Sequence, residues 1–321
     1  MKWNIFGLPF SYHQSSCSNM KPKMFSWQEL YGDVELWVDS AIEQGLTTQR
    51  NRKKKYAWIC ESRSIIPFFS NLYSLDDKGN MVVNGITPIL QDMIDEYDLI
   101  FTCDKDIVKL HDKIRFCYAG STLPWTKKEN RSLDANKYQL CSFISSNKNM
   151  CKGHQMRHDL HDLLKSEFGK PSESNTEPAV HVCGSIIGEP FGSSVAPHLE
   201  GGSPYWHDKT SGISPYVYSI IMENDSYKSY FTEKITDCFA LGTIPIYWGA
   251  PDIGDYFDID GIIQVDNIEE IVTKLRWLNI PENRNRDIVT RKNAMLNNLK
   301  KIDFLESPDD MLYRKIMEDV Q

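Results

Sequence analysis

Five side chains that could act on a phosphorylated sugar lie close together in the sequence. They are Glu223, Asn224, Tyr230, Glu233 and Lys234. Carboxylates, amides and phenols bind hydroxyl groups, whereas an ammonium group binds anions. The set therefore suits a ligand that is part anion and part polyhydroxyl, and a sugar carried on a diphosphate fits that description.

The start of a predicted helix positions these groups. Thr232 is a plausible N-cap, and Glu233 falls in the first turn, where the helix dipole favours a negative charge. Apolar side chains follow at helical spacing and Gly242 then ends the helix; they are Ile235, Cys238, Phe239 and Leu241. Lys234 thus projects beside unpaired backbone N–H groups, a general arrangement for holding phosphate. The alternative is a capped surface helix with a solvated Glu and Lys.

The segment resembles the signature of the α1,3/α1,4-fucosyltransferases, glycosyltransferase family 10. The matching positions are Glu223, Asn224, Ser226, Tyr230, Thr232, Glu233, Lys234, Gly242, Ile244, Pro245 and Gly249. The family usually has Ser directly after the Asn, whereas this chain has Asp225 and then Ser226. The spacing from Asn224 to Tyr230 and Lys234 is kept.

Two upstream segments resemble the same family in the same order. Residues 137–157 resemble the strand, Ser-Asn turn and helix that open its donor domain, which implies that Arg157 contacts the donor diphosphate. Ser146 and His154 flank that turn and are candidates to line the phosphate pocket. Residues 56–67 resemble the strand end that carries the family's catalytic carboxylate, here Glu61.

The resemblance implies a GT-B architecture, with two α/β Rossmann-like domains facing a central cleft. It also implies inverting transfer of L-fucose from GDP-fucose to a glycan hydroxyl, α1,3 or α1,4 to an N-acetylglucosamine or glucose-type residue, with no metal or other cofactor. Glu61 would be the general base, and Arg157 and Lys234 would stabilise the diphosphate. Glu233 and Tyr230 would bind ribose hydroxyls or lie beside the sugar ring.

Other interpretations remain open. A related GT-B enzyme could use another GDP-sugar or a UDP-sugar, and a homologue could bind the sugar nucleotide without catalysis. A glycoside hydrolase would need two carboxylates flanking one bond. Glu61 could instead pair with Arg63 at the surface, and Arg157 could pair with Asp159 or Asp162.

Composition narrows the class of protein. A chain of 321 residues, 41% of them hydrophobic, is long enough for two globular domains. The net charge of −8 argues against general nucleic-acid binding. No apolar stretch approaches the about 20 residues of a membrane span, and the N-terminus lacks the pattern of a signal peptide. Eight cysteines without CxxC pairs favour a reduced, cytoplasmic setting. Without an N-terminal anchor, the chain resembles the soluble bacterial or viral type of the family, or a trimmed catalytic domain.

Alternating strand and helix patterns run along both halves of the chain, and apolar runs predict buried strands at 56–60, 98–103, 114–120, 139–145 and 215–223. They predict an acceptor domain over 1–125, a linker over 126–136, a donor domain over 137–290 and a helical tail over 291–321. Residues 184–214, rich in Gly, Ser and Pro, predict a mobile functional loop or disorder. Trp125 and Trp206 are candidates for stacking on an acceptor sugar.

One basic cluster, residues 52–55, interrupts the acidic composition. It predicts a solvated loop before a strand, and a partner or peripheral membrane contact is the alternative. The sequence gives no indication of the oligomeric state.

Overall fold

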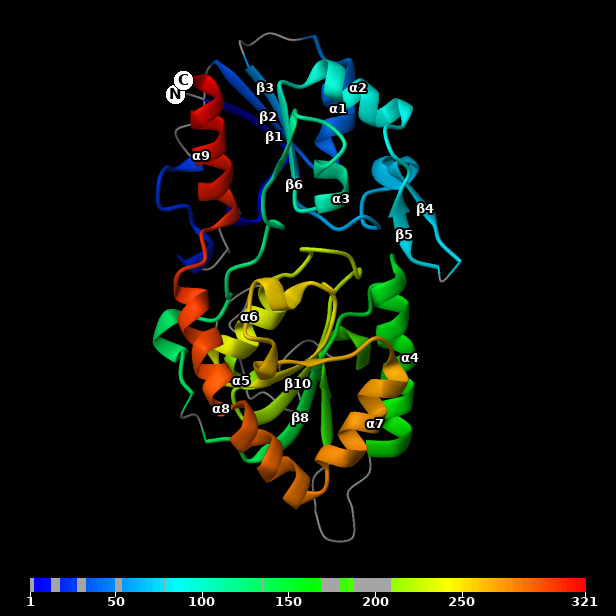
Figure 1. Cartoon of the computed structure of the whole chain (residues 1–321), viewed down its shortest axis with the longest axis vertical. Helices are drawn as coiled ribbons and strands as arrows, with labels where there is room; N and C mark the ends of the chain where they lie inside the picture. The colour runs from blue at the N-terminus through cyan, green and yellow to red at the C-terminus, as the bar shows by residue number, and fades with distance from the viewer. Residues whose placement is uncertain are drawn as a thin grey trace. The chain divides into compact units, whose positions relative to one another are not determined.

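The chain forms two compact units, and each contains a five-stranded parallel sheet (Figure 1). The computed structural model describes residues 3–12, 18–27, 33–49, 54–77, 79–133, 136–168, 179–187 and 209–321. Unit 1 comprises residues 1–122, 225–232 and 306–321, and unit 2 comprises residues 123–224 and 233–305.

Unit 1 is built on a sheet whose strands follow the order β1-β2-β3-β6-β7. The strands are β1 (Trp3–Phe6), β2 (Val34–Val38), β3 (Lys54–Ile59), β6 (Leu99–Thr102) and β7 (Ile114–Phe116). The helices are α1 (Ala41–Thr47), α2 (Pro88–Glu96), α3 (Lys105–Val108) and α9 (Pro308–Val320). A short antiparallel ribbon, β4 (Tyr73–Leu75) with β5 (Met81–Val83), is inserted between β3 and α2.

Successive residues of these strands bury their side chains on opposite faces, as the two-residue repeat of a strand requires. Trp37, Ala57 and Ile59 pack on one face together with α1 and α2. Tyr56 and Trp58 pack on the other face, where Leu312 and Ile316 of α9 cover them. The last helix of the chain thus completes the core of the first unit (Figure 1).

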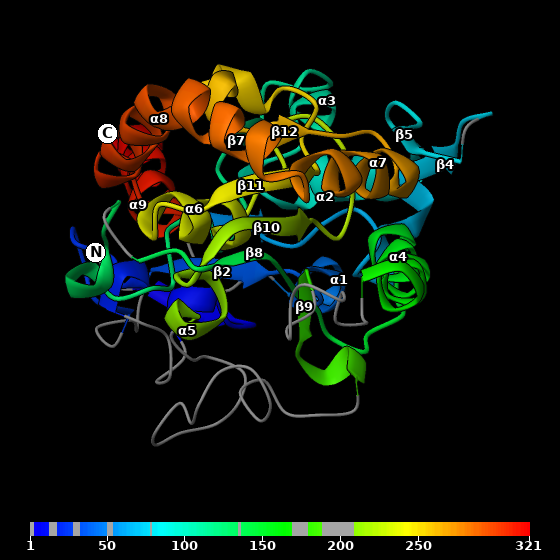
Figure 2. The ribbon, with the colours of Figure 1, turned by 90° about the horizontal axis from the view of Figure 1, so that it is seen from below.

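Unit 2 is built on a sheet whose strands lie side by side in the order β12-β11-β10-β8-β9, as Figure 2 shows. They are β8 (Gln139–Ile144), β9 (Val180–Cys183), β10 (Tyr216–Met222), β11 (Ile244–Trp248) and β12 (Ile263–Gln264). Its helices are α4 (Lys152–Phe168), α5 (Thr210–Ile213), α6 (Glu233–Ala240), α7 (Ile268–Leu278) and α8 (Pro281–Asp303).

The predicted α/β class and the alternation of strands with helices are confirmed. The apolar runs predicted at 56–60, 98–103, 139–145 and 215–223 correspond to β3, β6, β8 and β10. The run at 114–120 forms a strand only over Ile114–Phe116. Most of the predicted loop at 184–214, and Trp206 with it, lies outside the described residues.

Contacts divide the chain differently from the predicted domain boundaries. The predicted tail 291–321 is shared, because α8 lies in unit 2 and α9 lies in unit 1. Residues 225–232, within the predicted donor domain, also pack in unit 1. No helix among the described residues is long and apolar enough to cross a membrane.

The prediction that residues 52–55 form a solvated loop is wrong for Lys54 and Lys55, which begin β3. Lys55 is fully buried. Its ammonium donates to the carbonyls of Gly45 (2.6 Å) and Thr48 (3.2 Å) and pairs with the carboxylate of Glu96. Buried charges require such partners, and here they join β3 to α1 and α2.

Asp309 makes the attachment of α9 sensitive to pH. Its buried carboxylate accepts hydrogen bonds from Ser11 and from Nε1 of Trp27 (2.8 Å). Burial raises the pKa of Asp309 to about 7, although these hydrogen bonds oppose the change. The folded protein therefore keeps a proton that an unfolded chain loses near pH 4, so the free energy of unfolding falls as the pH rises between these values.

The free energy of unfolding should fall between pH 5 and pH 8 by about 2–3 kcal/mol less in Asp309→Asn than in the unmodified chain. The variant should melt several degrees above the unmodified chain at pH 8 and close to it at pH 5. Asp92→Asn, at an exposed position of α2, is the control. Parallel melting curves for D309N and the unmodified chain across this pH range would contradict the assignment.

Candidate active site

The carboxyl end of β10 meets the amino end of α4 inside unit 2. Gly153, in the first turn of α4, donates its N–H to the carbonyl of Asn224 (3.2 Å). A Cβ at position 153 would lie 2.6 Å from that oxygen and closer still to the carbonyl of Glu223. Only glycine allows this approach, and it brings the Asn224 backbone beside a helix terminus of the kind that favours anions.

Arg157 fixes the same junction from the next turn of α4. It is buried, and its Nη2 donates to the carbonyl of Met222 and to Oδ1 of Asn224 (3.0 Å). The carboxylate of Asp162, one of the alternative partners, lies 3.2 Å from Nδ1 of His161. Arg157 and Asn224, which the sequence predicts to bind one ligand, are therefore brought together at the end of β10.

Lys234 joins this group from the first turn of α6. Its ammonium lies 3.1 Å from Oε2 of Glu223, and the lysine side chain keeps 27% of its surface exposed while Glu223 has none. Glu223 is held in place because its N–H donates to the carbonyl of Trp248 on the neighbouring strand (2.9 Å). The pair balances charge inside the unit and leaves part of the lysine side chain exposed.

The pKa of His154 reflects the burial and the positive charge of this region. Burial, and after it the positive charges of Arg157, Lys148 and Lys234, lower the pKa of His154 to about 4. Its Nδ1 accepts the N–H of Met150 (3.1 Å). His154 is therefore neutral near pH 7, and the surrounding positive charge favours an anionic ligand.

Ser146 is half-buried in the turn that follows β8. Its carbonyl accepts the hydroxyl of Ser145 (3.3 Å), and the next residue, Asn147, donates its N–H to Ser185 Oγ (3.1 Å). The predicted turn between β8 and α4 is therefore held by serine side chains.

Glu233 lies at the start of α6, where the sequence predicts it, but its carboxylate is buried. Oε1 accepts from Nζ of Lys209 (2.9 Å), which also lies 3.1 Å from Oδ2 of Asp237 and stacks over the ring of Trp125. A catalytic or donor-binding role for Glu233, and acceptor stacking for Trp125, remain predictions. Their observed partners form a buried ionic cluster.

Tyr230 packs within unit 1. Its side chain is 1% exposed and stacks on Tyr227, with ring centroids 4.9 Å apart. Cys103 and Ala119 complete this small core. The arrangement favours a packing function for Tyr230, and the predicted contact with the donor is untested.

Glu61 follows β3 in unit 1, at the carboxyl end of the strand as expected, and is half-buried. Arg63, its alternative partner, binds Asp104 in a bidentate manner, with Nε and Nη2 each 2.7 Å from a carboxylate oxygen. Its guanidinium also lies 4.2 Å from the ring centroid of Tyr227.

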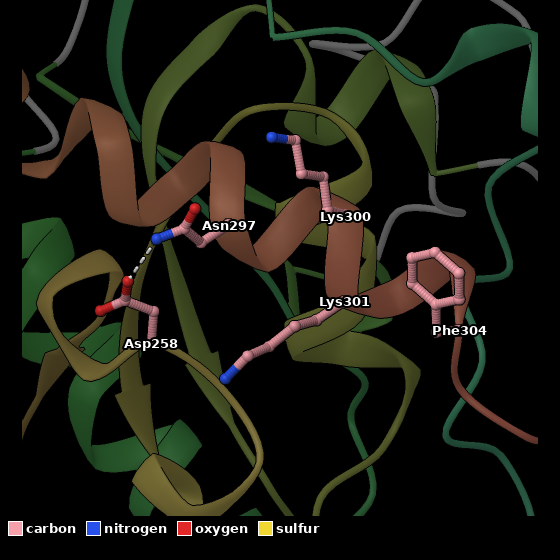
Figure 3. Close-up of a pocket in the computed structure, with 5 residues that line it drawn as sticks. All are labelled: Asp258, Asn297, Lys300, Lys301 and Phe304. Carbon is pink, nitrogen blue, oxygen red and sulfur yellow. Dashed lines mark hydrogen bonds between the residues drawn. The ribbon is translucent and has the colours of Figure 1, made fainter.

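A separate hollow of about 400 Å³ opens on unit 2 near the end of α8 (Figure 3). Its lining residues are Asp258, Asn297, Lys300, Lys301 and Phe304. Nδ2 of Asn297 donates to Oδ2 of Asp258 (2.8 Å) across one side. None of the lining residues belongs to the predicted site.

Sequence reasoning missed three charged residues near the predicted groups. Lys148 lies in the turn before α4, Asp39 directly follows β2, and Lys209 precedes α5. An acidic residue directly after a buried strand is a signal that could have identified Asp39. Lys209 lies near the end of the Gly-, Ser- and Pro-rich segment 184–214, without any distinguishing pattern.

The two α/β units, each built on a parallel sheet, have the fold of GT-B glycosyltransferases. The structure of TarM from S. aureus, solved with fondaparinux, α-GlcNAc-glycerol and UDP, superimposes with a TM-score of 0.51 at 12% identity, covering 88% of this chain and 54% of that chain. A crystal structure of an α1,3-fucosyltransferase with GDP-fucose gives a TM-score of 0.44 at 19% identity, covering 88% of this chain and 72% of that one.

The sequence itself is related to the α-(1,3)-fucosyltransferase FucT of Helicobacter pylori. The two are 28% identical in an alignment of 190 positions that covers 56% of this chain and 38% of that protein. This relative confirms the predicted resemblance to glycosyltransferase family 10, although the chain spans well under half of its length. No protein-family model matches the sequence.

The close approach at Gly153 predicts a loss of stability in Gly153→Ala. Alanine favours a helix by about 1 kcal/mol, yet its Cβ would push α4 away from β10. We expect a melting temperature several degrees lower. Gly254→Ala is the matched control, because a Cβ there would meet nothing nearer than 3.7 Å. Equal melting of the two variants would show that α4 and β10 are not packed this tightly.

Proposed function

We propose that the chain is an inverting fucosyltransferase that moves L-fucose from GDP-fucose to a hydroxyl of an acceptor glycan. The observation that carries this proposal is the group formed by Arg157, Asn224 and Lys234 at the end of β10, in a chain related to an α-(1,3)-fucosyltransferase. The acceptor would be an N-acetylglucosamine or glucose-type residue joined in α1,3 or α1,4 linkage.

The donor diphosphate would lie where α4 begins and β10 ends. Arg157 has five N–H donors in a rigid fork, which suits phosphate oxygens. Lys234 would add a second positive charge, and the start of α4 would add backbone N–H groups. In the proposed reaction these groups supply the positive charge that the departing diphosphate needs, so no metal or other cofactor is required.

Glu61 would act as the general base. The acceptor oxygen attacks C1 of fucose, the carboxylate of Glu61 takes the hydroxyl proton, and GDP departs with the electron pair of the broken C–O bond. Attack from the face opposite the leaving group inverts the anomeric centre. The position of Glu61 after β3 supports this function, because open α/β sheets bind ligands at the carboxyl ends of their strands.

A second candidate is a GT-B enzyme that uses another GDP-sugar or a UDP-sugar. Phosphate-binding residues select neither the base nor the hexose, and TarM, which has the same fold, was solved with UDP. A sugar-nucleotide-binding homologue without catalytic activity is the third candidate. The two experiments below separate these candidates.

The first prediction concerns the nucleotide. GDP at 100 times its dissociation constant should stabilise the chain by about 2.7 kcal/mol, raising its melting temperature by a few degrees. GDP-fucose should give at least as large a shift, and GDP-mannose, UDP and UDP-galactose smaller ones. A shift confined to UDP compounds would contradict the proposed donor while keeping a glycosyltransferase.

Lys234→Ala and Arg157→Lys should both reduce the shifts with GDP and GDP-fucose. Each shift is measured against the variant's own melting temperature, because K234A also leaves buried Glu223 without its ion pair. Lys165→Ala, at an exposed position on α4, is the control and should keep the full shift.

The second prediction concerns the base. Glu61→Gln should retain the GDP-fucose shift and lose at least about 10²-fold in turnover, the lower end of the contribution of a general base. Turnover is measured as GDP release with an N-acetyllactosamine acceptor. Near-normal turnover would exclude Glu61 as the base, and binding without turnover by the unmodified chain on acceptors of this class would favour the non-catalytic candidate.

A further inference from the structure

Asp39 occupies an unusual backbone position beside Glu61. It directly follows β2 and has a φ of +50°, in the left-handed region. Among the described residues, Ser229 is the other non-glycine residue with a positive φ. This conformation is unfavourable for most side chains, but Asp and Asn tolerate it when their side chain bonds locally.

The backbone of Asp39 is held on both sides. Its N–H donates to the carbonyl of Trp58 on β3 (3.0 Å), and its own carbonyl accepts the N–H of Ile42 in the first turn of α1 (3.0 Å). The change of direction from β2 to α1 is therefore fixed, and so is the point from which the carboxylate projects.

The carboxylate of Asp39 extends the pairing between β2 and β3 beyond the last ladder bond. The register pairs Val38, the last residue of β2, with Trp58, and β3 continues for one more residue to Ile59. Oδ1 of Asp39 then accepts the N–H groups of Cys60 (2.8 Å) and Glu61 (3.2 Å). The backbone that carries the proposed base is thus attached to the neighbouring strand by one side chain.

The charge of Glu61 also acts on the carboxyl group of Asp39. Burial, and secondly the charge of Glu61, raise the pKa of Asp39 to about 7, although its two backbone hydrogen bonds oppose this. Two carboxyl groups near each other at the ends of adjacent strands repel when both are ionised, and packing of the core does not require this arrangement.

We infer that Asp39 is a positioning residue for the reaction: its carboxyl group holds the Cys60–Glu61 backbone so that the Glu61 side chain stands ready to accept the acceptor proton. This inference rests on the proposed function of Glu61. Asp39 takes no proton from the substrate, so its effect on turnover passes through Glu61. Misplacement of a catalytic group by about 1 Å can lower a rate about 10²-fold.

Asp39→Ala tests the hydrogen bonds, and Asp39→Asn tests their rescue. Ala cannot accept the two N–H groups, so turnover with GDP-fucose and N-acetyllactosamine should fall at least about tenfold. The affinity for GDP should stay unchanged, because its proposed site lies in unit 2. Asn keeps an oxygen acceptor and tolerates a positive φ, so D39N should restore most of the turnover. Should D39A fail to fold, Asp39→Gly removes the acceptor in a residue that adopts this φ freely.

Asp98→Ala is the matched control. Oδ2 of Asp98 accepts the N–H of Lys55 (2.7 Å), so this carboxylate makes the same kind of bond to the same strand, β3, but at the amino end. D98A should lose stability like D39A while keeping normal turnover. Equal loss of turnover in D39A and D98A would show that Asp39 contributes only to stability, and would overturn the inference.

A double-mutant cycle separates the inference from the function on which it rests. If Asp39 acts through Glu61, D39A should lower turnover in the unmodified chain and cause little further loss in the E61Q background. Equal losses in both backgrounds would overturn the positioning function of Asp39. Normal turnover of E61Q would overturn the base assignment itself, and absence of turnover by the unmodified chain would overturn both.

Discussion

The candidate donor site depends on the hydrogen bonds made by the buried guanidinium of Arg157. A charged group with 5% exposure requires hydrogen-bond partners, and Arg157 finds them in the carbonyl of Met222 and the amide of Asn224. The same bonds fix α4 against the end of β10, where Gly153 allows contact between the two backbones. Burial, followed by the positive charges of Arg157, Lys148 and Lys234, keeps His154 neutral at this helix terminus.

Unit 1 uses polar side chains in a similar way at the end of β3. Asp39 binds the backbone of Cys60 and Glu61, and two residues further Arg63 is paired with Asp104. Ser64 donates to Oδ2 of Asp225 (2.8 Å), in the segment 225–232 that packs in this unit. The residues that follow Asn224 are therefore anchored next to the strand end that carries Glu61, which gives this part of the signature a structural function besides any contact with the donor.

Much of the fold was predictable because parallel strands buried on both faces read as continuous apolar runs. β3, β6, β8 and β10 are runs of this kind. α6 follows its predicted helical spacing and ends at Ala240, two residues before Gly242, which has a φ of +63°. Distant pairing was not predictable. The sequence around Lys55 indicates a solvated residue, because its partner Glu96 lies far away in the chain. The place of α9 in unit 1 likewise depends on packing against the distant Tyr56 and Trp58.

The candidate site was predictable to the extent that local pattern determines it. The signature and the turn before α4 identified Arg157, Asn224 and Lys234, which the structure brings together. The buried partners of Glu233 and Tyr230 could not be foreseen, because Lys209 and Tyr227 carry no distinctive spacing. The position of Asp39 directly after a buried strand could have been read from the sequence, but its backbone angle and its hydrogen bonds to the neighbouring strand could not.

A crystal structure of the chain with GDP-fucose would be the most direct test of the proposed donor site. The diphosphate oxygens should lie within hydrogen-bond distance of Arg157 and Lys234, at the start of α4. A diphosphate bound elsewhere, for example between Lys300 and Lys301 in the hollow at the end of α8, would contradict the proposal.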